Sequence, residues 1–288
     1  MDTKMTDSDL TPTQDRGLQK IGPEKLATVS SSTKEEVFEK FFLAALGSVP
    51  WVGGFLSSAA SLKTEESERK YNHLQTQWIK EHQNKIIKLS ETVQDILQRL
   101  SSLGDEINER IQSEEYLSLV RQAFRAWDRA STDEKRKYFA NIISNAAGTK
   151  LCSDDVIRLF IEWLDLYDEV HFAVIKAIHK SPTITRYAIW EDIRGEFPRD
   201  DSAEADLFKL MISDLNIGRV IRLEREINTY GQFLKNKNSY KGIRSSTTTM
   251  ESAFENSKPY VLTELGKQFV HYTMNDVVTR LEKNNNQS

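Results

Sequence analysis

Cysteine is nearly absent from this sequence, and its scarcity excludes a whole class of folds. Cys152 is the single cysteine among 288 residues, so the chain cannot build an internal disulfide framework. Chains of this kind fit a reducing compartment, where disulfide-stapled domains are rare. The five histidines are scattered, and none stands near cysteines or carboxylates at the spacing of a zinc site. We therefore expect no metal ion and no cofactor.

A leader segment and a strong net charge are lacking as well. The N-terminus has no compact apolar core behind a basic region, so we expect no secretory signal and a cytoplasmic protein. The net charge is −4 and the pI is about 5.9, which gives the whole chain no attraction to nucleic acid or anionic lipid. No nucleophile–base pair is recognisable, and we therefore expect a protein that is not an enzyme.

Charge is missing from one internal stretch, residues 41–62, which reads FFLAALGSVPWVGGFLSSAASL between Lys40 and Lys63. A single helix that crosses a bilayer needs about 20 apolar residues. Pro50 argues against one continuous helix, because proline removes a helical hydrogen bond and clashes with the preceding turn. The stretch therefore predicts a hairpin of two short helices that meet near Gly47–Pro50.

Such a hairpin has two possible environments. The simpler interpretation buries it among the helices of the protein. The alternative is that it leaves the core and engages the inner membrane, with its backbone kept helical because lipid satisfies no open backbone groups. In that case Trp51, Val52, Phe55 and Leu56 are the expected membrane contacts, and the protein is peripheral to the membrane.

Composition and periodicity divide the chain into four parts and predict a mainly α fold. Residues 1–33 are polar and predict a disordered N-terminal arm. Residues 34–164 predict a helical bundle, in which a long helix over residues 64–103 repeats apolar positions every three or four residues. That repeat is typical of a coiled coil and predicts a homo-oligomer formed through this helix. Residues 276–288 predict a polar tail.

The remaining part, residues 165–275, predicts a winged helix-turn-helix domain. Three helices alternate with short β-branched segments, and a long polar wing or loop over residues 228–258 precedes a returning strand. The expected helices are 168–180, 186–195 and 202–216, and the expected strands are 183–185, 219–223 and 260–262. In the third helix the apolar residues expected to face inward are Leu207, Leu210, Met211 and Leu215.

The charges of this domain disfavour DNA as its partner. The third helix offers Glu204, Asp206 and Asp214 against Lys209, and an acidic face repels a polyanion. The wing is basic, and it could follow a phosphate backbone or contact a protein partner. Its candidate contact residues are Lys235, Lys237, Lys241 and Arg244.

Three segments in succession resemble the bacterial abortive-infection alpha (Abi-alpha) family. They are STDEKRKYFANIISNAAGTK (Ser131–Lys150), DDVIRLFIEWLDLYDEVHFAVIKAI (Asp154–Ile178) and LTELGKQFV (Leu262–Val270). Their order and spacing agree with the family over roughly residues 64–274. The resemblance implies a bacterial protein that defends against phage by halting or killing the infected cell, and it supplies no catalytic residues. The insertion at 228–258 is longer than is usual for such a protein.

Three functional hypotheses follow. The first is a non-enzymatic anti-phage protein of the abortive-infection type that acts when its uncharged hairpin engages inner-membrane lipid. The second is a winged-helix DNA-binding transcriptional regulator whose helical half dimerises. The third is an oligomerising scaffold or sensor that recruits a separate effector, with a defence component or a phage trigger as its protein partner.

The membrane hypothesis predicts that the purified protein makes liposomes leak and that Phe55→Asp abolishes the leakage, because a carboxylate resists transfer into hydrocarbon. Release of an encapsulated dye measures the effect. Equal leakage by the two proteins, or none from either, would contradict the hypothesis.

Overall fold

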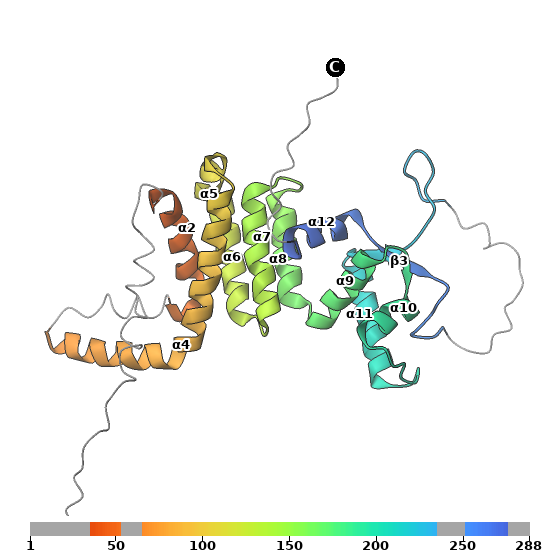
Figure 1. The fold of residues 1–288 in the computed structure, drawn as a ribbon, viewed down its shortest axis with the longest axis horizontal. Helices are drawn as coiled ribbons and strands as arrows, with labels where there is room; N and C mark the ends of the chain where they lie inside the picture. The colour runs from red at the N-terminus through yellow and green to blue at the C-terminus, as the bar shows by residue number, and fades with distance from the viewer. Residues whose placement is uncertain (1–34, 53–64, 235–250, 276–288) are drawn as a thin grey trace, which may run out of the picture.

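The computed structural model describes residues 35–52, 65–234 and 251–275 (Figure 1). Over these residues the protein is mainly helical, with one small three-stranded antiparallel sheet. This agrees with the mainly α prediction. The predicted arm at 1–33 and the predicted tail at 276–288 lie outside the described residues.

Helices α2 to α8 form the helical body. Their bounds are α2 Glu35–Ser48, α4 Glu65–Ser102, the 3-10 turn η2 Asp105–Ile107, α5 Asn108–Gln112, α6 Glu114–Arg129, α7 Asp133–Gly148 and α8 Asp154–Leu166. Helix α6 lies at the centre and packs on α2, α7 and α8. Its Tyr116 and Phe124 are fully buried, as is Phe139 of α7, so one apolar core runs through the body.

The uncharged stretch begins inside this core. Helix α2 ends at Ser48, a bend at Val49 interrupts the helix, and helical conformation resumes at Pro50. The interruption lies within the predicted joint, Gly47–Pro50. Proline is well placed there, because the first helical position needs no N–H donor. Phe41, Ala45 and Val49 are fully buried, and the Phe41 ring lies edge-on to Phe124 of α6, with centroids 6.4 Å apart. Residues 53–62 lie outside the described part.

Helix α4 follows the predicted long helix closely, but its apolar seam is occupied from within the chain. Leu89, Val93, Ile96 and Leu100 are buried, and α4 packs along α7. Figure 1 shows that α4 bends, so that its N-terminal part points away from the body. The C-terminal half of the seam is therefore unavailable to a second copy, and pairing of copies through α4 stays a prediction.

The C-terminal elements follow α8 directly. They are α9 Glu169–Lys180, β1 Ile184–Thr185, α10 Arg186–Ile193, α11 Ala203–Ile217, β2 Ile221–Leu223, β3 Pro259–Leu262 and α12 Glu264–Thr273. Strand β3 lies between β1 and β2, antiparallel to both, and places Ile184 and Leu223 beside Tyr260. The hydroxyls of Thr185, Ser202 and Thr263 cap α10, α11 and α12, which fixes where each helix begins.

Helix α12 returns to the body and packs on α7 (Figure 1). Its Phe269 ring lies edge-on to Phe160 of α8, with centroids 5.5 Å apart. Two buried asparagines of α7 donate hydrogen bonds to the C-terminal end of α12. Asn141 Nδ2 donates to the Thr273 carbonyl at 2.7 Å, and Asn145 Nδ2 donates to the Tyr272 carbonyl at 3.1 Å. Because the last carbonyls of a helix have no intrahelical donor, these amides stabilise a buried helix end.

The start of α12 depends on a close backbone approach at Gly266. A side-chain methyl group at this position would overlap the carbonyl oxygen of Val220, which also accepts the Thr263 N–H at 3.0 Å. We expect Gly266→Ala to lower the free energy of unfolding by about 1–3 kcal/mol, because overpacking forces the backbone apart. Urea denaturation followed by circular dichroism measures the change.

Gly47→Ala is the matched control, since no atom lies within 4 Å of a methyl group placed there in α2. We expect this variant to be more stable by about 0.5–1 kcal/mol, because alanine loses less conformational entropy in a helix. Equal stability of the two variants would contradict the close approach at Gly266.

Candidate functional site

The structure places the predicted membrane contacts in two groups. Val52 is buried, and Trp51 is half-buried in the helical body. The Trp51 indole N–H donates to Asp128 Oδ1 at 2.7 Å, and its ring stacks on His82 of α4 with centroids 5.4 Å apart. Phe55 and Leu56 lie outside the described residues. The basic wing residues expected to contact a partner also lie outside them, namely Lys235, Lys237, Lys241 and Arg244.

Helix α11 faces the core with a different set of residues from the one the sequence suggested. Its buried side is formed by Ala205, Phe208, Met211, Ile212 and Leu215. Leu207 and Leu210, which were expected to face inward, are 50% and 55% exposed, and Ile217 is 73% exposed. These three side chains recur at helical spacing, so they form an apolar strip on the outside of α11. We call this strip the α11 face.

An aromatic cluster supports α11 from beneath. Trp190 of α10 lies edge-on to Phe208 of α11, and also to Phe254, each with centroids 5.1 Å apart. Phe254 comes from the polar segment 228–258 that the sequence predicted to be a loop or wing. Asp200 holds this segment in place, since its Oδ1 accepts the Ala253 N–H at 3.0 Å. Part of the predicted wing therefore belongs to the core. The one signal of this in the sequence was Phe254, a large apolar residue in a polar segment.

A groove of about 440 Å³ opens beside the α11 face. Trp190, Phe208 and Met211 contribute apolar floor, and Leu207 of the α11 face lines it as well. The polar side chains at its edge are Arg194, Glu196 and Glu204. Its volume falls in the range of about 300–1,000 Å³ that is typical of ligand sites, so it can accept a large side chain of a partner.

Charge is separated between this region and the one that follows it in sequence. Residues 186–217 hold eight acidic side chains against four basic ones, whereas residues 219–244 hold seven basic against two acidic. Around the α11 face, Glu204 and Asp206 are exposed. A surface with this composition repels phosphate groups and attracts basic apolar segments.

A hairpin follows β2 and projects from the molecule (Figure 1). An antiparallel bridge joins Ile227 to Phe233, and Asn228 Oδ1 accepts the backbone N–H groups of Tyr230 and Gln232 at 3.0 and 2.9 Å. Gly231 adopts a positive φ of 76°, which glycine permits without strain. The turn presents Tyr230, which is 87% exposed. We call residues 227–234 the hairpin tip.

Two arginines lie against the hairpin tip, and they alternate in sequence with the exposed Glu224 and Glu226. The guanidinium groups of Arg222 and Arg225 lie 4.8 and 6.0 Å from the centroid of the Phe233 ring. A cation over an aromatic face is attracted by the ring quadrupole and restricts the ring. The tip is thus an aromatic projection with both arginines and glutamates at its base.

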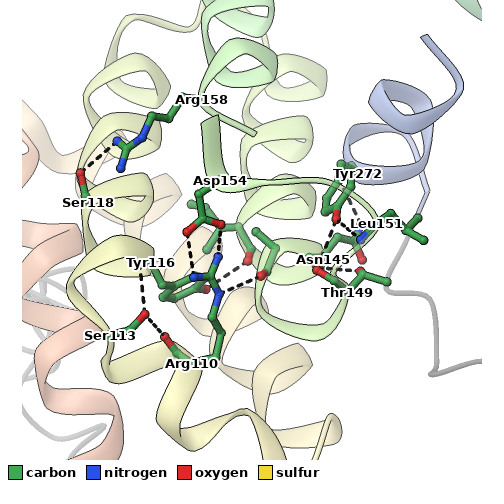
Figure 2. Close-up of polar contacts among 12 residues, drawn as sticks. Arg110, Ser113, Tyr116, Ser118, Asn145, Thr149, Leu151, Asp154, Arg158 and Tyr272 are labelled. Carbon is green, nitrogen blue, oxygen red and sulfur yellow. Dashed lines mark hydrogen bonds and ion pairs between the residues drawn. The ribbon is translucent and has the colours of Figure 1, made fainter. Parts of the chain in front are cut away.

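A second polar cluster lies in the body, where α5, α7, α8 and α12 meet (Figure 2). Arg110 donates to both carboxylate oxygens of Asp154 at 2.9 and 2.5 Å, and Tyr116 Oη donates to the Ile143 carbonyl at 3.0 Å. Burial raises the pKa of Tyr116 above its usual range and that of Tyr272 to about 12. Both phenols are therefore protonated donors at neutral pH. The cluster's groups bond one another, which indicates a structural role.

The part of the chain that the structure describes contains no group of three or more His, Cys, Asp or Glu side chains arranged to hold a metal ion. In the same residues, none of the helices is long and apolar enough to cross a bilayer.

Comparisons with known proteins found no matching family model, curated protein or solved structure. A functional proposal therefore has to start from the residues and geometry of this chain.

His171 connects α9 to the acidic side of α11. Its Nδ1 accepts the Asp168 N–H at 3.2 Å, and its Nε2 lies 3.7 Å from the Asp214 carboxylate of α11. Burial lowers the pKa of His171, although Asp168 and Asp214 favour its protonated form. Burial also lowers the pKa of His271 in α12.

These two shifts predict how stability depends on pH. As the pH falls, a histidine of the unfolded chain binds its proton near pH 6.5, whereas the buried histidine binds its proton only at a lower pH. Protonation therefore favours the unfolded chain. We expect the free energy of unfolding to be level above about pH 7 and to fall toward about pH 5. His171→Gln keeps an acceptor for Asp168 and should reduce the fall, and the double variant with His271→Gln should reduce it further. Denaturant titrations at each pH measure the free energy of unfolding of the wild-type protein and of both variants. An unchanged slope in the double variant would contradict the assignment.

Proposed function

We propose that this protein is a non-enzymatic binding protein of bacterial phage defence, of the abortive-infection type, and that it works as a scaffold or sensor. The observation that carries the proposal is the α11 face, an apolar strip left exposed between acidic side chains. Soluble proteins rarely leave contiguous apolar surface uncovered unless it binds something. The defence context comes from the resemblance of the three segments to the abortive-infection alpha family.

We infer that α9, α10 and α11 with the sheet are a winged helix-turn-helix, and that this unit is the binding module. The order of three helices with a strand after the first, a hairpin between β2 and β3, and β3 paired between its neighbours supports this inference. In that arrangement α11 is the third helix, which a DNA-binding member lays in the major groove. Here Leu207, Leu210 and Ile217 occupy its outer side.

DNA regulation is the weaker alternative. A helix that reads bases presents arginine, lysine, asparagine or glutamine to their edges, and basic groups to phosphates. The exposed Glu204 and Asp206 oppose this, and Lys209 alone supplies a cation on α11. The basic residues predicted for the wing favour nucleic acid, and gel shifts at several salt concentrations would detect such binding.

Membrane engagement of residues 41–62 stays a prediction, and it requires α2 to give up its contacts in the helical body. For α2 to leave the body, Phe41, Ala45 and Val49 must give up complete burial, and a large apolar side chain loses roughly 1.5–3 kcal/mol when it is exposed. The Trp51–Asp128 hydrogen bond must break as well. Insertion into lipid has to offset both, so a trigger is needed.

The proposal predicts that Leu207→Ser with Leu210→Ser abolishes protection while the fold survives. Both side chains are half-exposed, and loss of apolar anchors at an interface weakens binding by about tenfold or more. Phage plating on bacteria that express the protein measures protection, and immunoblots confirm equal protein levels. We expect the wild-type protein to reduce plaque numbers and the double variant to match an empty vector.

Leu151→Ser is the matched control, because Leu151 is a leucine of similar exposure, 53%, in the connection between α7 and α8. It should protect as well as the wild-type protein. Equal protection by the double variant would show that the α11 face is not used, and a wild-type protein that protects against no phage in the panel would remove the defence assignment.

A further inference from the structure

The α11 face and its groove call for an occupant that is apolar, aromatic and basic. Leu207, Leu210 and Ile217 supply exposed apolar surface, and the groove beside them has an aromatic floor at Trp190 and Phe208. Acidic side chains surround both. An occupant with a large ring would fill the groove, and cationic groups at its edge would pair with these carboxylates.

The same chain carries an exposed segment that is apolar and aromatic, with arginines at its base. The hairpin tip exposes Ile227, Tyr230, Phe233 and Leu234, and Arg222 and Arg225 lie against its Phe233 ring. The Asn228 turn fixes the tip, so little conformational entropy is lost when it binds. Tyrosine combines a large ring with a polar hydroxyl, which makes it a frequent anchor at protein interfaces.

The two surfaces cannot meet within one molecule. Figure 1 shows the hairpin tip, between β2 and the grey segment, projecting to one side of the sheet while α11 extends to the other. Pairing of one α11 face with another is unfavourable, because it would place Glu204 and Asp206 against their own kind. We propose that the hairpin tip of one copy docks in the α11 groove of a second copy.

In this arrangement Tyr230 enters the groove and its hydroxyl is available to the carboxylate of Glu196 or Glu204. Ile227 and Leu234 cover Leu207 and Leu210, and Arg225 stays at the acidic rim. The interface is heterologous: in an open pair one copy keeps an unused groove and the other keeps an unused tip, so assembly continues into larger species. This inference rests on the proposed function, for which it names a second copy as the partner of the α11 face.

Two full-length variants test the proposal. The face variant carries Leu207→Ser and Leu210→Ser, and the tip variant carries Tyr230→Ser and Phe233→Ser. Leu151→Ser is again the control, and thermal unfolding confirms that each protein folds. Sedimentation velocity over a range of concentrations and salt measures the mass against the 33.2 kDa of one chain.

The wild-type and control proteins should grow past the dimer as concentration rises and should dissociate in high salt. Each variant alone should associate at least about tenfold more weakly. An equimolar mixture of the two variants should form a dimer and nothing larger, because one intact tip meets one intact groove. Pairing of two α11 faces or of two tips cannot give this result, because neither contact needs one variant to meet the other.

A wild-type protein that stays monomeric would overturn the proposal, and so would variants that fail to combine when mixed. Association that persists in both variants would also overturn it and would point to α4 instead. A gel shift of single-stranded or duplex DNA that is lost in the tip variant alone would assign the tip to nucleic acid and would also overturn it. If the wild-type protein is monomeric but the face variant loses phage protection, the proposed function stands with another partner. If neither effect is seen, both proposals fail.

Discussion

The return of the last helix to the body is the constraint on which the arrangement of this protein depends. Helix α12 reaches the body only because Asn141 and Asn145 of α7 satisfy carbonyls at its buried end and Phe269 packs among the rings of α8. Since α9 follows α8 without a long linker, the elements from α9 to β3 are tied to the body at both their entry and their exit. A module held at two points presents its outer surface in a defined direction.

The outer surface of this module is determined by which side chains fill its small core. The inner side of α11 packs on α10 and on the Phe254 segment, which leaves Leu207, Leu210 and Ile217 outside. The hairpin between β2 and β3 supplies a second exposed surface, with Tyr230 and Phe233 at its tip. On the α11 side the exposed carboxylates of Glu204 and Asp206 work against DNA.

Much of the local structure was predictable from the sequence. Pro50 marked the break after α2, and the expected strand at 219–223 marked β2. The site was not predictable in the same way. Helix α11 carries apolar residues on more than one side, so periodicity allowed Leu207 and Leu210 to face inward. Phe254 looked like part of a polar loop, yet it is a partner of Trp190 and helps decide which side of α11 is buried.

Caps, proline breaks and alternating strands depend on residues only a few positions apart, and these short-range effects by themselves determined where most helices and strands begin and end. Burial depends on segments far apart in sequence, such as Trp51 with Asp128 or Asn145 with Tyr272. Only the folded chain could therefore decide which apolar side chains enter the core and which stay outside to bind. Exposure of the α11 face is a property of packing, since identical leucines in the same helix would be buried if another surface had covered them.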